Sequence, residues 1–441
     1  MKEERCEDVQ ESNEVPIPFP DILKAAQDAV QGAGGFVVDA ANGAGGFVVD
    51  AANGVGGFVG QLFSGNAEDG ERQVSAPEEE VKEAPKNYVA PNPVYDAREL
   101  RELDDLTERY EKLTAPGLFD RAGETVMGFL PEEIKNVAKS AAESITEQEL
   151  YTQMMKIVAE GFGTLERYAA AATVSEKDVL SEISKASEWQ LSSLDELCLF
   201  RSYIVARASQ GQNIQHLLLA AVEGGATGAV GFAGIPFNLV LSMFLYYRAV
   251  QSIALSYGYD VKNDPSELMI ASEVLSFAFS PNGADLGGAA GVVGKIMGLA
   301  EVATVGQVIK KGWQAMAERG GACLLIAQMR ALAHASARKA LEKAGKAGLE
   351  KSVFRNILEQ VGKRLPQKVV QRGVPVIGGF IGALFDAGQM QRTLSIADTF
   401  YHKRFLVEKE LRIAELVEHV DLDLEMTDGV ANEVLEVAQA N

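Results

Sequence analysis

The stretch Gly224–Tyr247, GGATGAVGFAGIPFNLVLSMFLYY, decides the fold because it carries no charged side chain over a length that could cross a bilayer. Its first half is rich in glycine, and small residues three and four positions apart let helices approach closely. Proline at its centre removes a backbone donor and kinks or splits a helix. We therefore expect a glycine-lined helical hairpin, either inside a membrane or in the core of a soluble helical protein. The residues that define it are Gly228, Gly231, Gly234 and Pro236.

Two further glycine-rich runs lie downstream. Gly283–Gly298 places glycines at three- and four-residue spacing, which predicts a second close-packing face. Val374–Phe385, VPVIGGFIGALF, is too short to cross a membrane alone. Between these runs the pattern predicts two long helices, Gly306–His334 and Ala335–Gln371, and strand signals are few after Tyr95. The predicted fold is an all-α, multi-helix bundle with glycine-rich apolar hairpins.

The N-terminal region differs in composition from the rest of the chain. The 11-residue unit GAGGFVVDAAN occurs twice without change, at 32–42 and 43–53, which places one face in register every three helical turns. Its glycines disfavour helix in water, so a flexible linker, a lipid-induced interfacial helix and a short strand array all stay open. The predicted organisation is a largely disordered region at 1–94 with repeats at 21–64, a helical domain at 95–418 and an acidic tail at 419–441.

Charge is distributed unevenly along the 441 residues. The net charge of −21 argues against nucleic acid as a partner, because binding phosphate backbones requires a clustered basic face. Residues 1–100 hold 19 acidic and 7 basic side chains, whereas residues 301–400 hold 15 basic and 7 acidic ones. The chain thus combines an acidic N-terminal region with a basic C-terminal half.

The cysteines and the N-terminus indicate a reducing compartment. Cys6, Cys198 and Cys323 are odd in number and widely spaced, so neither a disulfide framework nor a zinc site is predicted. The acidic N-terminus lacks the apolar segment of a secretion signal. We expect a cytoplasmic protein, peripheral to or inserted in the inner face of the cytoplasmic membrane.

No catalytic motif is visible in the sequence. Gly288–Lys295, GAAGVVGK, has Ala289 where a phosphate-binding loop needs glycine, and Ile296 where it needs Ser or Thr. The four histidines are isolated from one another, and no GxSxG nucleophile motif is present. The sequence therefore predicts no metal and no cofactor, and it favours a non-enzymatic role without excluding an enzyme.

Three charged residues lie against the apolar runs: Arg248, Asp260 and Asp386. A charge buried there needs a partner, and an Arg248–Asp386 ion pair would supply one. Alternatively, each side chain reaches solvent at a helix end. A pocket lined by these three residues is the site expected if the protein is instead a soluble hydrolase or small-molecule-binding protein.

The basic half of the chain is concentrated in Arg330–Arg372, which holds eleven basic and three acidic residues. Basic side chains beside an apolar run attract an anionic membrane surface. Lys343, Lys346 and Lys351 are the predicted lipid-docking residues, although a solvated helix face balanced by the acidic region would show the same pattern.

Several of these motifs resemble one known family. Gly224–Glu267 combines the glycine-spaced run, a proline before an apolar helix, Tyr-Gly-Tyr-Asp and Asp-Pro-x-Glu, and resembles the signature of the EcsC family. Gln367–Ala397 and Phe129–Ile134 look like two further parts of that family's pattern. Asp386 departs from it, because the family more often has an apolar or amide residue there. The residues that match the first motif are Gly228, Gly231, Gly234, Pro236, Arg248, Tyr257, Gly258, Asp260 and Pro265.

The resemblance implies an architecture rather than a reaction. The family is named for a bacterial protein encoded beside an ABC transporter, and it offers no catalytic residue to transfer to this chain. We therefore expect a membrane-associated, non-enzymatic accessory to a transporter or envelope process, with a membrane or membrane protein as its partner. A toxin-like pore former, suggested by the glycine runs, is a weaker alternative.

Overall fold

The computed structural model describes residues 88–114, 147–169, 174–187, 189–210, 235–279, 289–299, 321–362 and 378–418. These residues form helices and turns, and no strand occurs among them, so the predicted all-α class is confirmed. The repeats at 21–64, the tail at 419–441, and Gly228, Gly231 and Gly234 lie outside the described residues. The glycine-rich hairpins therefore stay a prediction.

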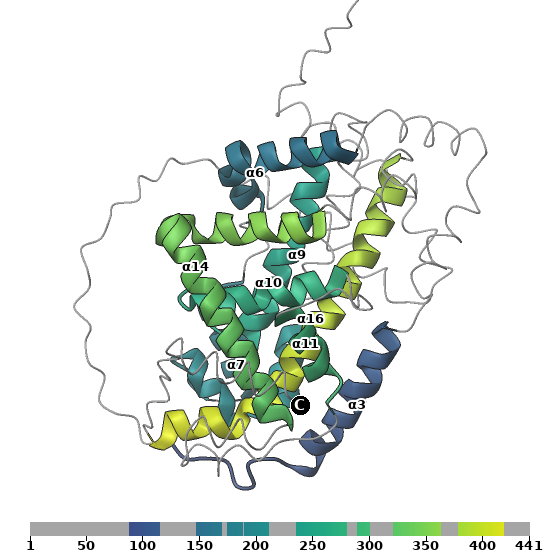
Figure 1. The fold of residues 1–441 in the computed structure, drawn as a ribbon. Helices are drawn as coiled ribbons and strands as arrows, with labels where there is room; N and C mark the ends of the chain where they lie inside the picture. The colour runs from purple at the N-terminus through teal and green to yellow at the C-terminus, as the bar shows by residue number, and fades with distance from the viewer. Residues whose placement is uncertain are drawn as a thin grey trace, which may run out of the picture.

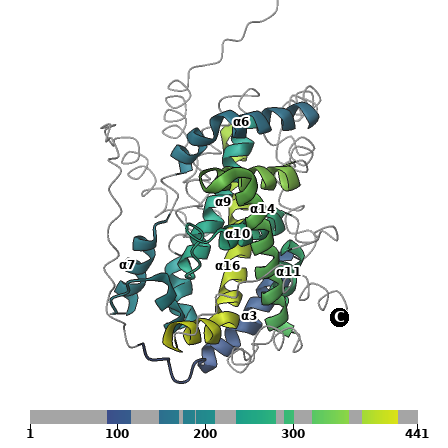
Figure 2. The same cartoon turned by 60° about the vertical axis from the view of Figure 1, so that its left-hand side comes forward.

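Helices α9, α10 and α16 form the centre of the bundle, and the other helices pack around them (Figure 1). Helix α14 crosses α10, α6 lies across one end of α9, and α3 packs along α16. Figure 2 shows that α16 runs through most of the length of the bundle. The helices are α3 (Ala97–Thr114), α6 (Glu147–Ala169), α7 (Glu176–Ser187), α9 (Ile235–Ser256), α10 (Pro265–Phe279), α11 (Ala289–Met297), α14 (Gly321–Ile357) and α16 (Gly378–Glu418), with a 3₁₀ turn η2 (Leu194–Leu199) and a π turn η5 (Leu358–Gly362).

Helix α9 is the apolar centre of the fold. It begins at Ile235, so Pro236 lies in its first turn, where a missing backbone donor costs little, instead of kinking its middle. Among the described helices, α9 alone is long and apolar enough to cross a membrane, over Leu239–Ser256, and 89% of that window is buried in the protein. Phe244 packs edge-on against Phe162 of α6 and Phe354 of α14, with ring centroids 5.4 and 4.9 Å apart. This surrounding makes the described α9 a core helix.

The family motif after α9 builds a tight turn into α10. Gly258 has a φ of +83°, and the amides of Gly258 and Tyr259 donate to the carbonyls of Leu255 and Ala254, which is a Schellman helix end. The Asp260 carboxylate accepts hydrogen bonds from the two backbone amides that follow the turn, at 3.0 Å each. The proline of Asp-Pro-x-Glu, Pro265, is the first residue of α10, where its fixed φ suits a helix start.

Helix α14 consists of two helical arms that meet at a kink, and the kink is not where the sequence predicted the break. The chain stays helical through His334 and Ala335, where the sequence predicted a break. The bend is at Gly345, whose φ of 66° and ψ of 173° strongly favour glycine. A Cβ built there would meet nothing within 4 Å, so the constraint is backbone conformation and not crowding. The bend gives α14 two arms that meet at an elbow, visible in Figure 1.

One glycine of the second run makes a close contact between helices, and the close-packing face of the whole run stays a prediction. A Cβ built on Gly294 of α11 would lie 2.9 Å from the Phe277 ring of α10, closer than real Cβ contacts allow. The missing side chain therefore lets α11 approach α10.

Candidate functional site

The C-terminal half of α16 carries an unusual set of buried charges. An uncompensated charge inside a protein costs several kcal/mol, so each of these groups needs partners. The side chains involved, all less than one-tenth exposed, are Asp398, Lys403, Arg404, Glu408, Lys409 and Arg412.

Arg404 is the centre of this network. Its guanidinium donates two hydrogen bonds to Glu267 of α10, at 2.5 and 2.6 Å, and a third to Glu408 at 2.9 Å. The guanidinium also lies 3.8 Å from the ring centroid of Tyr259. Arg330 of α14 pairs with Glu408 at 3.1 Å. Burial would raise the pKa of Glu408, but the two arginines outweigh it and lower the pKa to about 2.

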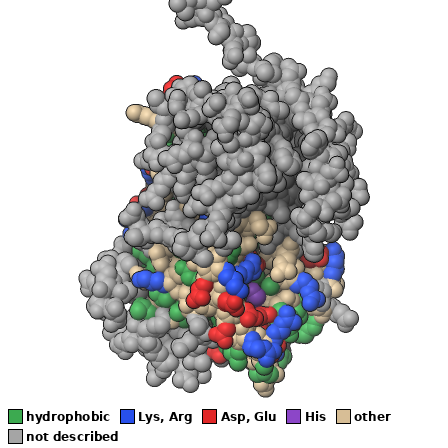
Figure 3. Space-filling view, turned by 90° about the vertical axis from the view of Figure 1, so that its right-hand side faces the viewer, with side chains coloured by type: hydrophobic (Ala, Val, Ile, Leu, Met, Phe, Trp, Pro, Cys, Tyr) green, Lys and Arg blue, Asp and Glu red, His purple; other side chains and the backbone are tan. Residues whose placement is uncertain are grey.

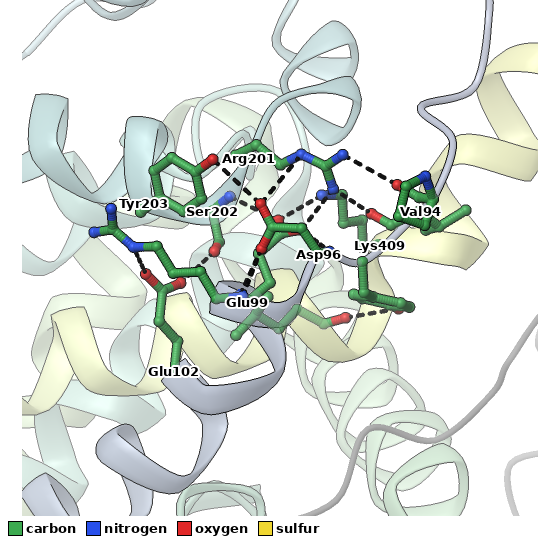
Figure 4. Close-up of polar contacts among 12 residues, drawn as sticks. Val94, Asp96, Glu99, Glu102, Arg201, Ser202, Tyr203 and Lys409 are labelled. Carbon is green, nitrogen blue, oxygen red and sulfur yellow. Dashed lines mark hydrogen bonds and ion pairs between the residues drawn. The ribbon is translucent and has the colours of Figure 1, made fainter.

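Lys409 joins α16 to the start of α3. Its ammonium lies 2.6 Å from the Glu99 carboxylate, and both side chains are fully buried. Glu99 also accepts hydrogen bonds from Arg201 at 2.9 Å and from the backbone amide of Ser202 at 2.9 Å. Figure 4 shows these groups converging from α3, α16 and the segment around Arg201. Two cations and the backbone amides of Asp96 and Ser202 thus surround a single buried carboxylate.

Arg412 explains why the family motif has glycine at 258. Its guanidinium donates to the backbone carbonyls of Tyr257 at 2.9 Å and Gly258 at 3.0 Å. A Cβ on Gly258 would collide with this guanidinium and lie 2.8 Å from the Leu194 carbonyl. The Tyr257 hydroxyl in turn donates to Asp398 at 2.7 Å. The motif is therefore the surface on which the charged half of α16 docks.

The network offers no recognisable reaction centre. The Ser202 hydroxyl donates to Glu102 at 2.5 Å and His402 Nε2 lies 3.3 Å from the same carboxylate, but no contact links the serine to the histidine. In a serine hydrolase, the nucleophilic hydroxyl is within hydrogen-bond distance of the general base. Burial raises the pKa of the Cys198 thiol to about 11, so it is not an activated nucleophile. Among the described residues, no group of three His, Cys, Asp or Glu side chains is placed to hold a metal ion.

A polar pocket of about 260 Å³ lies in the elbow of α14, against α10. One arm of α14 contributes Lys339 and Lys343, and the other arm contributes Ser352 and Asn356. The elbow at Gly345 is what brings these groups together. The full lining is Met269, Ser272, Glu273, Ser276, Ser336, Lys339, Ala340, Lys343, Ser352, Asn356, Ile357 and Gln360.

Glu273 is the one acidic residue in that lining. Burial raises the pKa of its carboxyl to about 7, against the opposing effect of a hydrogen bond from the Ala290 backbone amide at the start of α11. A substantial fraction of this group is therefore uncharged at neutral pH. The two lysines at the pocket leave it with a positive balance.

The sequence-predicted site residues are dispersed in the structure. Arg248 pairs with Glu350 of α14 at 3.0 Å. The backbone of Asp386 is in α16, but its side chain is outside the described residues, so an Arg248–Asp386 pair stays a prediction. The Asp260 carboxylate accepts hydrogen bonds from backbone amides of its own turn. The elbow pocket is lined by other residues than Arg248, Asp260 and Asp386, and a pocket around those three stays a prediction.

The three predicted lipid-docking lysines have different surroundings. Lys343 lines the elbow pocket and Lys346 is exposed beside it. Lys351 donates a hydrogen bond to the Ala159 carbonyl of α6 at 2.7 Å, so it ties α14 to α6.

Sequence reasoning missed both the charge network and the pocket. The segment DTFYHKRFLVEKELR, 398–412, has the charge density of a surface helix, and periodicity alone conceals its burial. One signal in the sequence could have revealed the burial. Charged and aromatic residues alternate around the whole helix, so it has no separate polar face to turn toward solvent.

The fold is that of a helical bundle whose signature turn anchors a charged C-terminal helix. The sequence model of the EcsC protein family matches residues 97–406, and the chain belongs to this family. No curated protein matches the chain. No solved structure matches it either.

Proposed function

We propose that this EcsC-family protein is a non-enzymatic peripheral membrane protein that docks on an anionic, cytoplasmic membrane surface through the elbow of α14. There it would serve as an accessory to a membrane process such as transport. The observation that supports the proposal most strongly is a group of three exposed lysines on this bend, Lys339, Lys343 and Lys346.

These lysines are grouped on one bend, in a segment with more basic than acidic residues. Within the described part of the chain, no ion pair is formed by any of the three, and 338–351 holds five basic and two acidic residues. On the α3 side of the molecule, Figure 3 shows acidic and basic side chains intermingled. There, Arg98 lies 3.2 Å from Glu102. An unbalanced basic patch is the feature that an anionic surface would neutralise.

Docking on a membrane surface fits the described structure better than crossing the membrane. Most of the α9 side chains over Leu239–Ser256 are buried, chiefly against α6, α10 and α16, instead of facing outward. Exposing them to lipid would break that core without an equivalent gain, because lipid tails are no more apolar than the neighbours they would replace. The lysine patch needs no such rearrangement.

An accessory role, and not a catalytic one, fits the buried network. Its carboxylates and cations are bonded to one another or to backbone carbonyls, which holds helices together and leaves no group aimed at a substrate. A membrane protein such as a transporter subunit is the proposed partner on the same membrane.

Vesicle flotation tests the proposal with the full chain. Each lysine near an anionic surface contributes about 1 kcal/mol, so removing three should lower binding about 100-fold at about 0.1 M salt. We expect wild type to float with phosphatidylcholine vesicles that contain phosphatidylglycerol and not with phosphatidylcholine alone. At about 1 M salt the Debye length falls to about 3 Å and binding should be lost.

The test variant is K339Q/K343Q/K346Q, which should not float. Its matched control is K156Q/K177Q/K262Q, which removes three exposed lysines from α6, α7 and the α9–α10 turn and should bind like wild type. Equal flotation of both variants, or salt-independent binding, would contradict docking through the elbow.

A further inference from the structure

The elbow pocket has the composition of a ligand site instead of a packing defect. Apolar voids in proteins are lined by carbon, whereas this one presents four serines, two amides, two lysines and a carboxyl group. Ser272 and Ser276 donate to backbone carbonyls of their own helix, at 2.7 and 3.0 Å. The available donors are therefore on α14 and the turn after it: Ser336, Lys339, Lys343, Ser352, Asn356 and Gln360.

The pocket's charge selects for an anion. Lys339 and Lys343 are one helical turn apart, where two like charges destabilise a helix unless something neutralises them. Neither lysine has an ion-pair partner in the part of the chain that the structure describes. Glu273, the lining carboxyl, is oriented toward the Ala290 amide of α11. Two lysines thus line a pocket whose charge a single group with two negative charges would balance.

Size limits what can enter. The pocket volume is about 260 Å³, which is many times the space that one water molecule needs. Small-molecule pockets begin at about 300 Å³, so a volume of about 260 Å³ suits a compact polar group. Hydroxyl and amide donors on the second arm, at Ser352 and Asn356, are suited to the remaining phosphate oxygens or to neighbouring hydroxyls.

We propose that the elbow pocket binds a phosphate monoester, with its two negative charges between Lys339 and Lys343 and its oxygens hydrogen-bonded by Ser352 and Asn356. The same chemistry is present in a soluble phosphorylated metabolite and in the headgroup of a lipid such as phosphatidic acid. The site shares two lysines with the proposed membrane patch, but it stands without that patch if the phosphate is soluble.

Calorimetric titration of the full chain with glycerol 3-phosphate tests the pocket directly. We expect saturable binding to wild type. K339Q/K343Q removes charge-assisted hydrogen bonds and should weaken binding at least about tenfold. N356L fills the pocket without changing net charge and should weaken it to a similar degree. K346Q, which removes a lysine outside the lining, should change binding less than about twofold.

A fold control accompanies these variants. N356L and the milder S352A should keep the helical circular dichroism and urea midpoint of wild type, so that lost binding reports the pocket. Glu273→Gln should bind the probe at pH 8 more tightly than wild type, because it removes the one acidic group of the lining. Unchanged binding in both N356L and K339Q/K343Q would overturn the site.

Binding to vesicles of different composition distinguishes a lipid phosphate from a soluble one. It also distinguishes binding in the pocket from binding through the lysine patch. Phosphatidic acid carries a monoester, whereas phosphatidylglycerol carries a diester with a single charge. If the ligand is lipid, wild type should prefer phosphatidic acid, and N356L should lose that preference while keeping its salt-sensitive binding to phosphatidylglycerol. Binding of glycerol 3-phosphate with no phosphatidic acid preference would assign the site to a soluble ligand. Absence of binding to both monoesters would refute it, whatever the result with phosphatidylglycerol.

Discussion

Two helices of this protein are rich in charge, and they use it in opposite ways. On α16, six charged side chains between 398 and 412 are buried, and each contacts a carboxylate, a cation or a backbone carbonyl of another segment. At the elbow of α14, Lys339, Lys343 and Lys346 are exposed and make no ion pair within the described residues. The comparison shows that charge density alone does not reveal the role of a charged helix. Charges that are paired inside the protein stabilise the fold, whereas unpaired, exposed charges are available to bind a ligand.

Breaking the charge network of α16 should lower the free energy of unfolding more than any other change proposed here. Arg404→Ala leaves Glu267 and Glu408 buried with one cation fewer, and removing one partner of a buried pair costs about 3–5 kcal/mol. Urea denaturation of the purified variant measures the loss. If that variant does not fold, Arg330→Ala provides the comparison, because Arg330 is 26% exposed and should cost less. A loss below about 1 kcal/mol in both variants would show that the network is not structural.

The same network should make the fold sensitive to acid. The pKa of Glu408 is lowered to about 2, so its stabilisation is fully present above the ordinary glutamate pKa of 4.5 and is lost as pH falls toward 2. A shift of that size corresponds to roughly 3 kcal/mol. Urea midpoints measured from pH 6 to 3 should fall more steeply for wild type than for Glu408→Gln, although the variant is less stable at pH 6. Parallel curves would contradict the assignment.

Two glycines with positive φ allow a matched comparison of the two regions. Gly258→Ala places a Cβ 2.8 Å from the Leu194 carbonyl and against Arg412, so crowding adds to backbone strain and the cost should be about 2–4 kcal/mol. Gly345→Ala has strain without crowding and should cost about 1–2 kcal/mol. Thermal unfolding of both variants gives the order. An equal or reversed order would mean that the turn at 258 does not pack as described.

The smallest effect on stability is expected at the elbow lysines. K339Q/K343Q/K346Q should change the free energy of unfolding by less than about 0.5 kcal/mol, because these side chains are exposed and outside the core. Urea denaturation checks this. A large loss of stability would place these lysines with the α16 charges as structural groups.

The sequence predicted the parts of this fold that depend on neighbours in the chain. The helical class followed from periodicity and few strand signals, and the motif containing Gly258 and Pro265 is a local turn. The partners of that motif are Asp398 and Arg412, about 140 to 155 residues away, and one sequence contains no signal that joins them. The elbow pocket was missed for the same reason, since it depends on a bend at Gly345 in a stretch read as uninterrupted helix.

Hydrogen exchange of the full chain, with and without vesicles containing phosphatidic acid, shows whether the elbow of α14, and not the buried charges of α16, contacts the membrane. It compares both helices in one experiment, because a membrane contact slows exchange where it forms and leaves the buried network unchanged. We predict added protection around the elbow, within 336–360, and none in 398–412. No change at the elbow, or protection confined to α16, would contradict the division between a structural network and a binding surface.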